Sequence, residues 1–209
     1  SGAVGSRLKQ YEPRTSQLDM LERVWTGFEK GKHQVIEAGT GTGKSFAYLV
    51  PAMFFSLSRK VPIVVSTKTK NLQEQLIDKD IPFLQKALDV PVRSIMVKGR
   101  ENYICVNKLA YLFVRLIQTP NHVDIVGISS IMLWLLKSEN GDFSEIHNSL
   151  VTRYKSQSYS DNHSCLGNRC PFKTVCFVNR LKKRAKSAHL IVVNHALLFT
   201  DICYEANIL

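Results

Sequence analysis

The stretch Glu37-Ala38-Gly39-Thr40-Gly41-Thr42-Gly43-Lys44-Ser45 decides how the rest of this sequence is interpreted. It follows a short apolar run, residues 33–38, and a long helix-like run begins at Lys44. A strand, a glycine-rich loop and a helix in this order are typical of a loop that binds phosphate, because glycines permit a tight turn and expose consecutive N–H groups at a helix N-terminus. Only the first position of the pattern G-x-x-x-x-G-K-[ST] is missed, where Ala38 replaces glycine. We therefore expect nucleotide binding; a glycine-rich turn that binds nothing is the alternative.

The residues of this loop are expected to divide the work of binding. Lys44 would neutralise phosphate charge and the Ser45 hydroxyl would ligate Mg²⁺, which makes these two the candidate catalytic residues. The nucleotide phosphates would lie among the other loop residues, which are Ala38, Gly39, Thr40, Gly41, Thr42 and Gly43.

Length and composition predict a protein with a sizeable core. With 209 residues and 44% apolar content, the chain is long enough for one domain or for a domain with an insertion. It has no apolar run of about 18 residues and no signal peptide, so we expect a cytoplasmic protein without a membrane partner. Residues 1–10 are expected to be a linker or tail.

The charge balance favours a polyanionic partner. The net charge is +11, and each Lys or Arg placed on a phosphate releases condensed counterions. Nucleic acid is the first candidate, and a merely basic surface is the alternative.

The segment before the loop has features of an adenine-binding element. Apolar residues recur every three or four positions over residues 17–29, which predicts an amphipathic helix closed by Gly31. The Gln17 amide can donate to and accept from an adenine edge, and Tyr11 can stack on the ring. A helix cap with a solvated glutamine is the alternative.

After the loop, helix-like and strand-like runs alternate. This alternation predicts an α/β fold with a parallel sheet flanked by helices, whose ligands bind at the carboxyl ends of the strands. The expected helices are residues 46–57, interrupted or bent near Pro51, and residues 71–88; the expected strands are residues 62–66, 93–97 and 190–193.

Thr67-Lys68-Thr69 follows one of these strands directly. Two hydroxyls and a lysine in this place can bond phosphodiester oxygens, although Thr69 as a helix N-cap is an equally simple explanation.

From residue 104 the alternation of strand-like and helix-like runs stops, which predicts an insertion into the α/β unit. Residues 105–117 and 123–136 are expected to be helical, residues 156–164 form a polar, loop-like stretch, and a further helix is expected from residue 172 to residue 186. No strand-like run interrupts these segments.

Four of the five cysteines bracket the insertion: Cys105, then Cys165-x₄-Cys170-x₅-Cys176. Thiolates at these spacings can close on one metal centre. Zinc sites commonly use tight C-x₂-C knuckles, whereas wider, unequal gaps suit an iron–sulfur cluster. The other readings are a Cys₄ zinc site and four buried thiols. Cys203 stands apart and is expected to be a core thiol.

The end of the insertion is strongly basic. Nine Lys or Arg residues and one acid, Asp161, lie between residues 151 and 189. The densest part includes Lys182, Lys183 and Arg184, which we expect to contact DNA; a solvated helix face is the alternative.

Together these segments resemble the first motor domain of the XPD/DinG group of superfamily 2 DNA helicases, and the bacterial DinG branch in particular. The resemblance spans about residues 11–209. It is carried by Glu37 to Ser45, Thr67-Lys68-Thr69, Lys98-Gly99-Arg100-Glu101-Asn102-Tyr103-Ile104-Cys105, the cysteine trio, and Ala188 to His195.

The resemblance implies a RecA-like P-loop ATPase half with a mostly helical [4Fe-4S] domain inserted. Motor-domain parts would cover residues 11–103 and 187–209, around a cluster domain at residues 104–186. It implies an enzyme that couples hydrolysis of ATP with Mg²⁺ to 5′→3′ movement on single-stranded or forked DNA, acting as a monomer in the bacterial nucleoid.

The resemblance also implies roles for individual residues. Arg14 and Gln17 correspond to the adenine-reading Q motif, residues 38–45 to motif I, and residues 67–69 to the DNA-contacting motif Ia. The cluster ligands would be Cys105, Cys165, Cys170 and Cys176.

One departure from the family pattern affects the expected activity. The family's motif II, Asp-Glu-Ala-His, holds Mg²⁺ and positions the attacking water. This sequence contains no Asp-Glu dipeptide and stops at Leu209, about where the family continues into that motif. We therefore expect an N-terminal fragment that binds nucleotide weakly and hydrolyses little or none. A non-catalytic nucleic-acid-binding module with a Cys₄ zinc site is the alternative, and a small P-loop kinase is a third interpretation.

Overall fold

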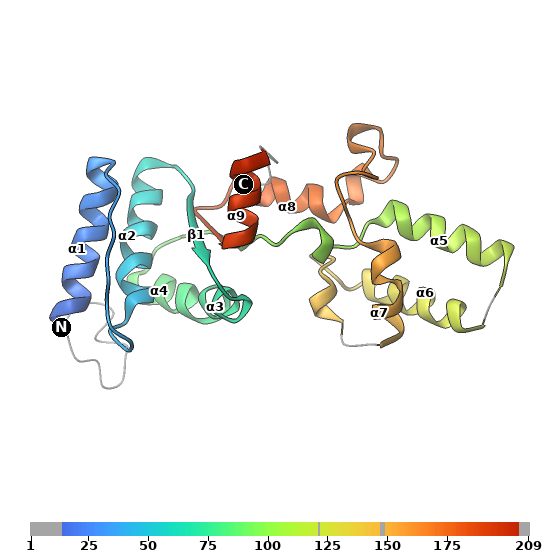
Figure 1. The fold of residues 1–209 in the computed structure, drawn as a ribbon, viewed down its shortest axis with the longest axis horizontal. Coiled ribbons are helices and arrows are strands. Elements are labelled where there is room, and N and C mark those ends of the chain that lie inside the picture. The colour runs from blue at the N-terminus through green and yellow to red at the C-terminus, as the bar shows by residue number, and fades with distance from the viewer. Residues whose placement is uncertain (1–13, 121, 147–148, 205–209) are drawn as a thin grey trace. The chain divides into compact units, whose positions relative to one another are not determined.

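The computed structural model describes residues 14–120, 122–146 and 149–204 (Figure 1). The expectations for residues 1–10 and for Tyr11 lie outside the described residues. The chain divides into two compact units, the first formed by Ser1–Val97 and Ala185–Leu209 and the second by Lys98–Arg184. The second unit covers most of the stretch that the sequence suggests as an insertion.

The first unit contains a parallel sheet of three strands in the order β1-β3-β2. The strands are β1 (Ile63–Thr67), β2 (Ser94–Met96) and β3 (Leu190–Asn194). In the central strand, residues 190–193 are all buried, as expected for an apolar, β-branched strand with a neighbour on each side. The predicted α/β fold with a small parallel sheet is confirmed.

Helices flank this sheet. Those of the first unit are α1 (Thr15–Lys30), α2 (Lys44–Arg59), α3 (Lys70–Gln75), a π-helical turn (Leu76–Asp80), α4 (Ile81–Leu88) and α9 (His195–Tyr204). The helix predicted at residues 17–29 is confirmed as α1. It ends at Gly31, whose φ of +58° is a conformation that glycine adopts without steric cost.

Two details of the predicted helices differ from the structure. The helix α2 continues through Pro51 without interruption. The helix expected over residues 71–88 is divided into α3, the π-helical turn and α4, with Pro82 in the first turn of α4. Proline lacks an N–H group, so its place at a helix start loses no intrahelical hydrogen bond.

The strand predicted at residues 33–38 is wrong. Residues 32–39 have no regular secondary structure, and the Val35 side chain is fully exposed. A strand requires a hydrogen-bonded neighbour, and within the described ranges no segment pairs with this one. A short apolar run alone therefore does not make a strand here.

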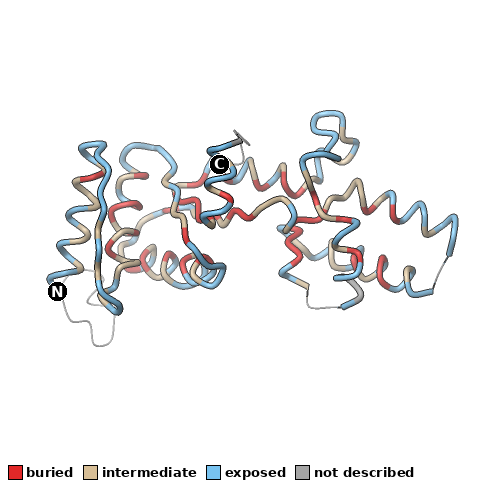
Figure 2. Tube along the Cα trace, viewed as in Figure 1, coloured by how far each residue is buried: buried red, intermediate tan, exposed pale blue. Residues whose placement is uncertain are grey.

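The core of the first unit lies between α2, the π-helical turn, α4 and the sheet. Leu49 and Met53 on α2 are wholly buried, as are Leu84 on α4 and Leu190 on β3. Figure 2 shows this burial as red segments along the helices and the central strand. Burial of these side chains supplies the apolar area that stabilises the unit.

The second unit is mostly helical. Its elements are α5 (Val106–Gln118), α6 (His122–Leu135), α7 (Ser149–Ser158), α8 (Phe177–Lys186) and the 3₁₀ turns Arg100–Asn102, Phe143–Glu145, Gly167–Arg169 and Lys173–Val175. A separate core unites them, made of Ile104, Leu109, Leu112, Ile128, Ile131, Phe143, Tyr154 and Phe177.

The helices expected at residues 105–117 and 123–136 are confirmed as α5 and α6. The helix α7 was not predicted, and its last residues, 156–158, lie in the stretch expected to be a loop. Its sequence is largely polar, so periodicity gave no signal; the buried Tyr154 shows which face packs. The helix expected from residue 172 begins at Phe177, after a 3₁₀ turn.

Across the described part of the chain, no helix combines the length and the apolar composition that a bilayer crossing needs.

The core of the first unit yields a stability prediction. Replacing Leu49 by Ala should lower the free energy of unfolding by about 3 kcal/mol, because it removes buried methyl groups and leaves a cavity. Urea denaturation followed by circular dichroism measures this. Phe54→Ala, on the same helix at a side chain 41% exposed, serves as the control and should cost clearly less. Equal losses for the two variants would contradict the assignment of the core.

Candidate functional site

The glycine-rich loop has the backbone conformation that its sequence predicts. Gly41 and Gly43 have φ values of +74° and +78°, a region that favours glycine. Gly43 is the N-cap of α2, and its carbonyl accepts hydrogen bonds from the N–H groups of Phe46 and Ala47. The loop therefore leads directly into a helix N-terminus, where the aligned peptide dipoles favour an anion.

The Lys44 ammonium lies within this loop. Its Nζ donates to the carbonyl oxygens of Ala38, at 2.9 Å, and Gly39, at 2.6 Å. The Thr42 hydroxyl donates to the same Gly39 carbonyl at 3.0 Å. The positive charge is thus held at the centre of the loop by neutral acceptors that a phosphate oxygen can replace.

The Ser45 hydroxyl is hydrogen-bonded to Tyr48, one turn further along α2. Burial raises the pKa of Tyr48, and the hydrogen bond with Ser45 opposes that rise.

Gln17 connects α1 to the loop. Its Nε2 donates to the Gly43 carbonyl at 3.1 Å, although 26 residues separate the two in sequence. A Cβ built on Gly43 would lie 2.2 Å from Gln17 Nε2, so no larger residue fits at position 43 without moving this amide. Arg14 is exposed at the N-cap of α1. The structure thus brings Gln17 to the loop, and Arg14 lies one helical turn before Gln17.

The Thr67-Lys68-Thr69 element lies at the carboxyl end of β1. Thr67 is buried, and its hydroxyl donates to the Thr69 carbonyl at 3.1 Å. The Thr69 hydroxyl accepts from the N–H of Leu72 at 3.3 Å and caps α3, as the alternative explanation predicts. Lys68 is exposed. The two hydroxyls serve the local structure, and Lys68 is the member of the three that has an exposed charge.

A serine–histidine contact at the same edge of the sheet was not predicted. Ser66 Oγ lies 2.7 Å from His195 Nδ1, where β1 ends and α9 begins. Asn194 accepts from the N–H of Leu197 at 2.7 Å and so caps α9. The sequence places Ser66 at the end of a predicted strand and His195 shortly after another, but their pairing depends on the β1–β3 register.

All four cysteines suggested as metal ligands line one cavity of about 170 Å³ in the second unit. Cys105 precedes α5, Cys165 and Cys170 flank the 3₁₀ turn Gly167–Arg169, and Cys176 precedes α8. None of them forms a disulfide. Burial raises the pKa of the Cys105 thiol, and the nearby Cys176 raises it further, whereas backbone N–H groups oppose the rise. Cys203, predicted to be a core thiol, is exposed, so that prediction is wrong.

The arrangement of these thiols can be compared with what each metal centre requires. Zinc–thiolate bonds are about 2.3 Å long, so four ligands of one zinc ion must nearly touch. In the residues that the structure describes, no three Cys, His, Asp or Glu side chains gather closely enough to hold a single ion. An iron–sulfur cluster occupies a volume and takes one thiolate on each iron, which suits thiols spread around a cavity.

The polar lining of the cavity suits an anionic group. It includes Arg100, Lys173 and Lys182 but no carboxylate. The Arg100 Nε is buried and makes no hydrogen bond with any described residue. A buried donor without a partner is costly, and cluster or thiolate sulfur would supply an acceptor. The cavity therefore combines four thiols with three cationic side chains, a donor set that is chemically compatible with an anionic, sulfur-ligated group.

Residues 17–149 match the DEAD/DEAH box helicase family. The chain belongs to this family. The match covers the glycine-rich loop, the Thr67-Lys68-Thr69 element and Cys105, whereas the other four cysteines lie beyond it.

Named relatives extend the similarity over nearly all of this helicase-family chain. The ATP-dependent DNA helicase YoaA of Haemophilus influenzae is 36% identical over 206 residues, which is 98% of this chain and 31% of the relative. The ATP-dependent helicase DinG of Mycobacterium tuberculosis is 37% identical over 94% of this chain and 32% of the relative. The 3′-5′ exonuclease DinG of Bacillus subtilis is 30% identical over 95% of this chain and 21% of the relative. The chain therefore spans about a third, or less, of the length of these proteins.

A buried ion pair fixes the segment that carries Cys105 in this helicase-family chain. Lys98 Nζ lies 2.7 Å from Asp142 Oδ2 and donates to the Ser144 hydroxyl at 3.1 Å. The Lys98 N–H donates to the Tyr103 hydroxyl at 3.1 Å, and burial raises the pKa of that hydroxyl. The Cys105 N–H in turn donates to the Ser158 carbonyl at 2.7 Å, so the cysteine backbone is tied to the end of α7.

A second ion pair, Lys108–Asp161, fixes the entry to the cysteine trio. The hydrogen bond from Lys108, followed by those from the Ser164 N–H and hydroxyl, holds the pKa of Asp161 well below its usual range. Ser164 adjoins Cys165, so this carboxylate links α5 to the loop of the trio.

The basic residues suggested for DNA contact face different surroundings along α8. Lys182 lines the cysteine cavity, Arg184 donates to Asn140 Oδ1 at 2.8 Å, and Lys183 is exposed.

The Lys98–Asp142 pair gives a second stability prediction. Asp142→Ala should lower the free energy of unfolding by about 3 kcal/mol, because it leaves a buried ammonium without its counter-charge. The double variant Lys98→Met/Asp142→Leu should recover much of that loss. Thermal unfolding measures both, with Glu139→Ala, at an exposed position of the same unit, as the control. A single variant as stable as the control would show that the pair contributes little.

Proposed function

We propose that this chain is the nucleotide-binding and cluster-binding part of an ATP-dependent DNA helicase. The observation that carries the proposal is the glycine-rich loop at the N-terminus of α2. The Lys44 ammonium lies within this loop, and the Gln17 amide donates to the carbonyl of Gly43. The family membership and the names of the relatives support the same assignment.

Nucleotide binding requires small exchanges of hydrogen bonds at this loop. Lys44 gives up the carbonyls of Ala38 and Gly39 for phosphate oxygens, and the N–H groups of the loop donate to the same phosphates. The Ser45 hydroxyl exchanges Tyr48 for Mg²⁺, which neutralises phosphate charge when it is bound. Gln17, which already contacts the loop, reads the adenine edge together with Arg14.

Binding does not commit this chain to hydrolysis. The reaction needs a carboxylate for Mg²⁺ and a second group that positions the attacking water. The chain contains no Asp-Glu dipeptide, so we propose that it hydrolyses ATP little or not at all by itself. In the helicase, nucleotide binding at this loop drives 5′→3′ movement along single-stranded or forked DNA, with the protein acting as a monomer in the bacterial nucleoid.

In this proposal Cys105, Cys165, Cys170 and Cys176 hold a [4Fe-4S] cluster in the cavity that they line. When bound, the cluster supplies four iron–thiolate bonds that fasten the irregular loops to α5 and α8. The buried, unpartnered Nε of Arg100 could donate to such a cluster, and Lys173 and Lys182 would offset its negative charge. The Lys98–Asp142 and Lys108–Asp161 pairs hold the segments that carry the ligands.

Nucleotide binding is tested with a fluorescent ADP analogue and Mg²⁺. Lys44→Ala should weaken binding about tenfold or more, because it removes charge-assisted hydrogen bonds to the phosphates. The matched control is Lys32→Ala, at an exposed position outside the loop. If Lys44→Ala binds as tightly as the control, the loop is a structural turn and the proposal is wrong.

The metal centre is tested by iron, zinc and acid-labile sulfide analysis of anaerobically purified protein. We expect about four irons and four sulfides per chain, with loss in Cys170→Ser. Cys203→Ser is the control and should retain the wild-type content, because this residue does not line the cavity. One zinc and no sulfide would favour a Cys₄ zinc module and refute the cluster.

A further inference from the structure

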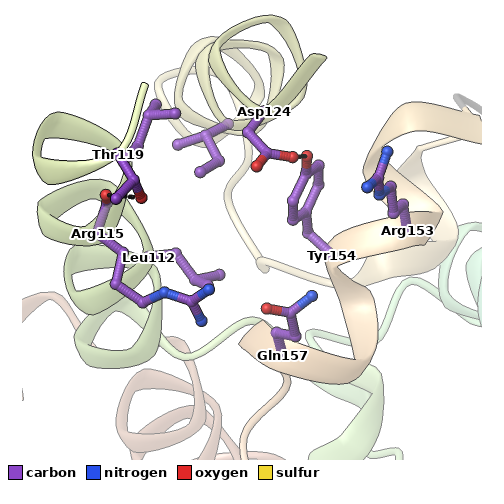
Figure 3. A pocket seen from close by; sticks show the side chains of 9 residues that line it. Leu112, Arg115, Thr119, Asp124, Arg153, Tyr154 and Gln157 are labelled. Atoms are coloured by element: carbon purple, nitrogen blue, oxygen red, sulfur yellow. Dashed lines mark hydrogen bonds between the residues drawn. The ribbon is translucent and has the colours of Figure 1, made fainter. Parts of the chain in front are cut away.

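A second cavity in the second unit, lined by α5, α6 and α7, has the chemistry of an anion site. Its volume is about 190 Å³ (Figure 3). The floor is apolar, with Leu112 and Ile128 both buried. Two arginines and an amide also line it: Arg115 on α5, and Arg153 and Gln157 on α7.

The donors in this cavity are not committed elsewhere. No described residue forms a hydrogen bond or ion pair with the Arg115 guanidinium or the Gln157 amide, and Figure 3 shows the two directed toward each other across the cavity. Arg153 lies over the ring of Tyr154, with its Cζ 5.9 Å from the ring centroid. Such a contact fixes the guanidinium plane and leaves its N–H groups available.

The one carboxylate in the lining does not compete for these arginines. Asp124 Oδ1 accepts from the Tyr154 hydroxyl (Figure 3). Burial and the neighbouring Asp124 charge raise the pKa of Tyr154, so its hydroxyl remains a donor. No ion pair within the described ranges links Asp124 to Arg115 or Arg153. The site therefore presents two positive charges to a ligand and keeps its acid engaged.

Neighbouring side chains favour a nucleic-acid strand over a free anion. Tyr111 precedes Arg115 by one turn on α5 and is 67% exposed, so it offers a ring on the same helix face. The apolar floor and an exposed aromatic ring add nothing to the binding of inorganic phosphate. They do favour a strand, whose sugars and bases contact apolar surface and stack on aromatic rings.

We infer that the cavity between α5, α6 and α7 binds the backbone of single-stranded DNA, with Arg115 and Arg153 each on one phosphate. The arginine fork matches phosphate geometry, and Gln157 adds a neutral donor. This inference rests on the proposed function and assigns a part of the DNA path to residues that are remote in sequence from Thr67-Lys68-Thr69 and from Lys182 to Arg184.

The test measures binding of a fluorescein-labelled oligothymidylate to the whole chain by anisotropy over a range of salt concentrations. The double variant Arg115→Gln/Arg153→Gln should bind about tenfold more weakly at low salt, and its salt slope should fall by about 1.4, the value expected for two phosphate contacts on a single strand. The conservative Arg115→Lys/Arg153→Lys variant should retain most of the slope.

A matched control and two further readouts make the result specific. Arg23→Gln removes one charge from an exposed position on α1 in the other unit and should leave affinity nearly unchanged. Thermal unfolding, iron content and binding of the ADP analogue should remain at wild-type values in the double glutamine variant. Inorganic phosphate at matched ionic strength should displace the strand no better than chloride.

Three results would overturn the inference. The first is a double glutamine variant that binds DNA like Arg23→Gln. The second is displacement by inorganic phosphate alone, which would make the cavity a simple anion site. The third is a wild-type chain that does not bind the strand. Since nucleotide and iron binding are measured on the same samples, each of these failures is distinguishable from failure of the proposed function.

Discussion

The pairing of β2 with β3 is the constraint on which the rest of the structure depends. Ile95 lies opposite Ile191 in a parallel register, although the whole second unit separates them in sequence. Parallel strands run in the same direction, so a chain that leaves the carboxyl end of β2 must return to the amino end of β3. The second unit is that connection, because it lies in sequence between the end of β2 and the start of β3.

Polar contacts reinforce both ends of this connection. On the return side, the N–H of Arg93 donates to His189 Nδ1 at 2.8 Å, and the N–H of His189 donates to the Arg93 carbonyl at 2.7 Å. On the outgoing side, the N–H of Val97 donates to the Val192 carbonyl, and the buried Lys98–Asp142 pair begins the second unit. These contacts satisfy backbone groups where the chain passes from one unit to the next.

Positive charge is placed differently at each candidate site. At the glycine-rich loop a single ammonium, Lys44, is held by carbonyl oxygens at a helix N-terminus. In the cysteine cavity, cations line the wall and carboxylates are absent from the lining. In the cavity of α5, α6 and α7, two arginines and apolar side chains line the same space. The first arrangement suits a compact, strongly charged phosphate chain, the second a buried anionic group, and the third a strand with both charge and apolar surface.

The sequence by itself determined the local features of this protein. Apolar periodicity located α1, the helix-like composition of residues 105–136 indicated α5 and α6, β-branched runs located β1 and β3, and glycine spacing located the loop that precedes α2. Each of these signals depends on neighbours a few residues apart. It did not locate α7, whose sequence is mostly polar, and it predicted a strand at residues 33–38 where the structure has none.

Tertiary structure alone decided what depends on distant segments. Residues 33–38 would form a strand only if another strand paired with them. The contact of Gln17 with Gly43 depends on how α1 packs on α2. The convergence of four cysteines on one cavity depends on the turns between helices. The cavity that contains Arg115 and Arg153 likewise exists only because α5 and α7 pack together. Local periodicity reports which face of a segment is apolar, but only long-range packing determines which other segment covers that face.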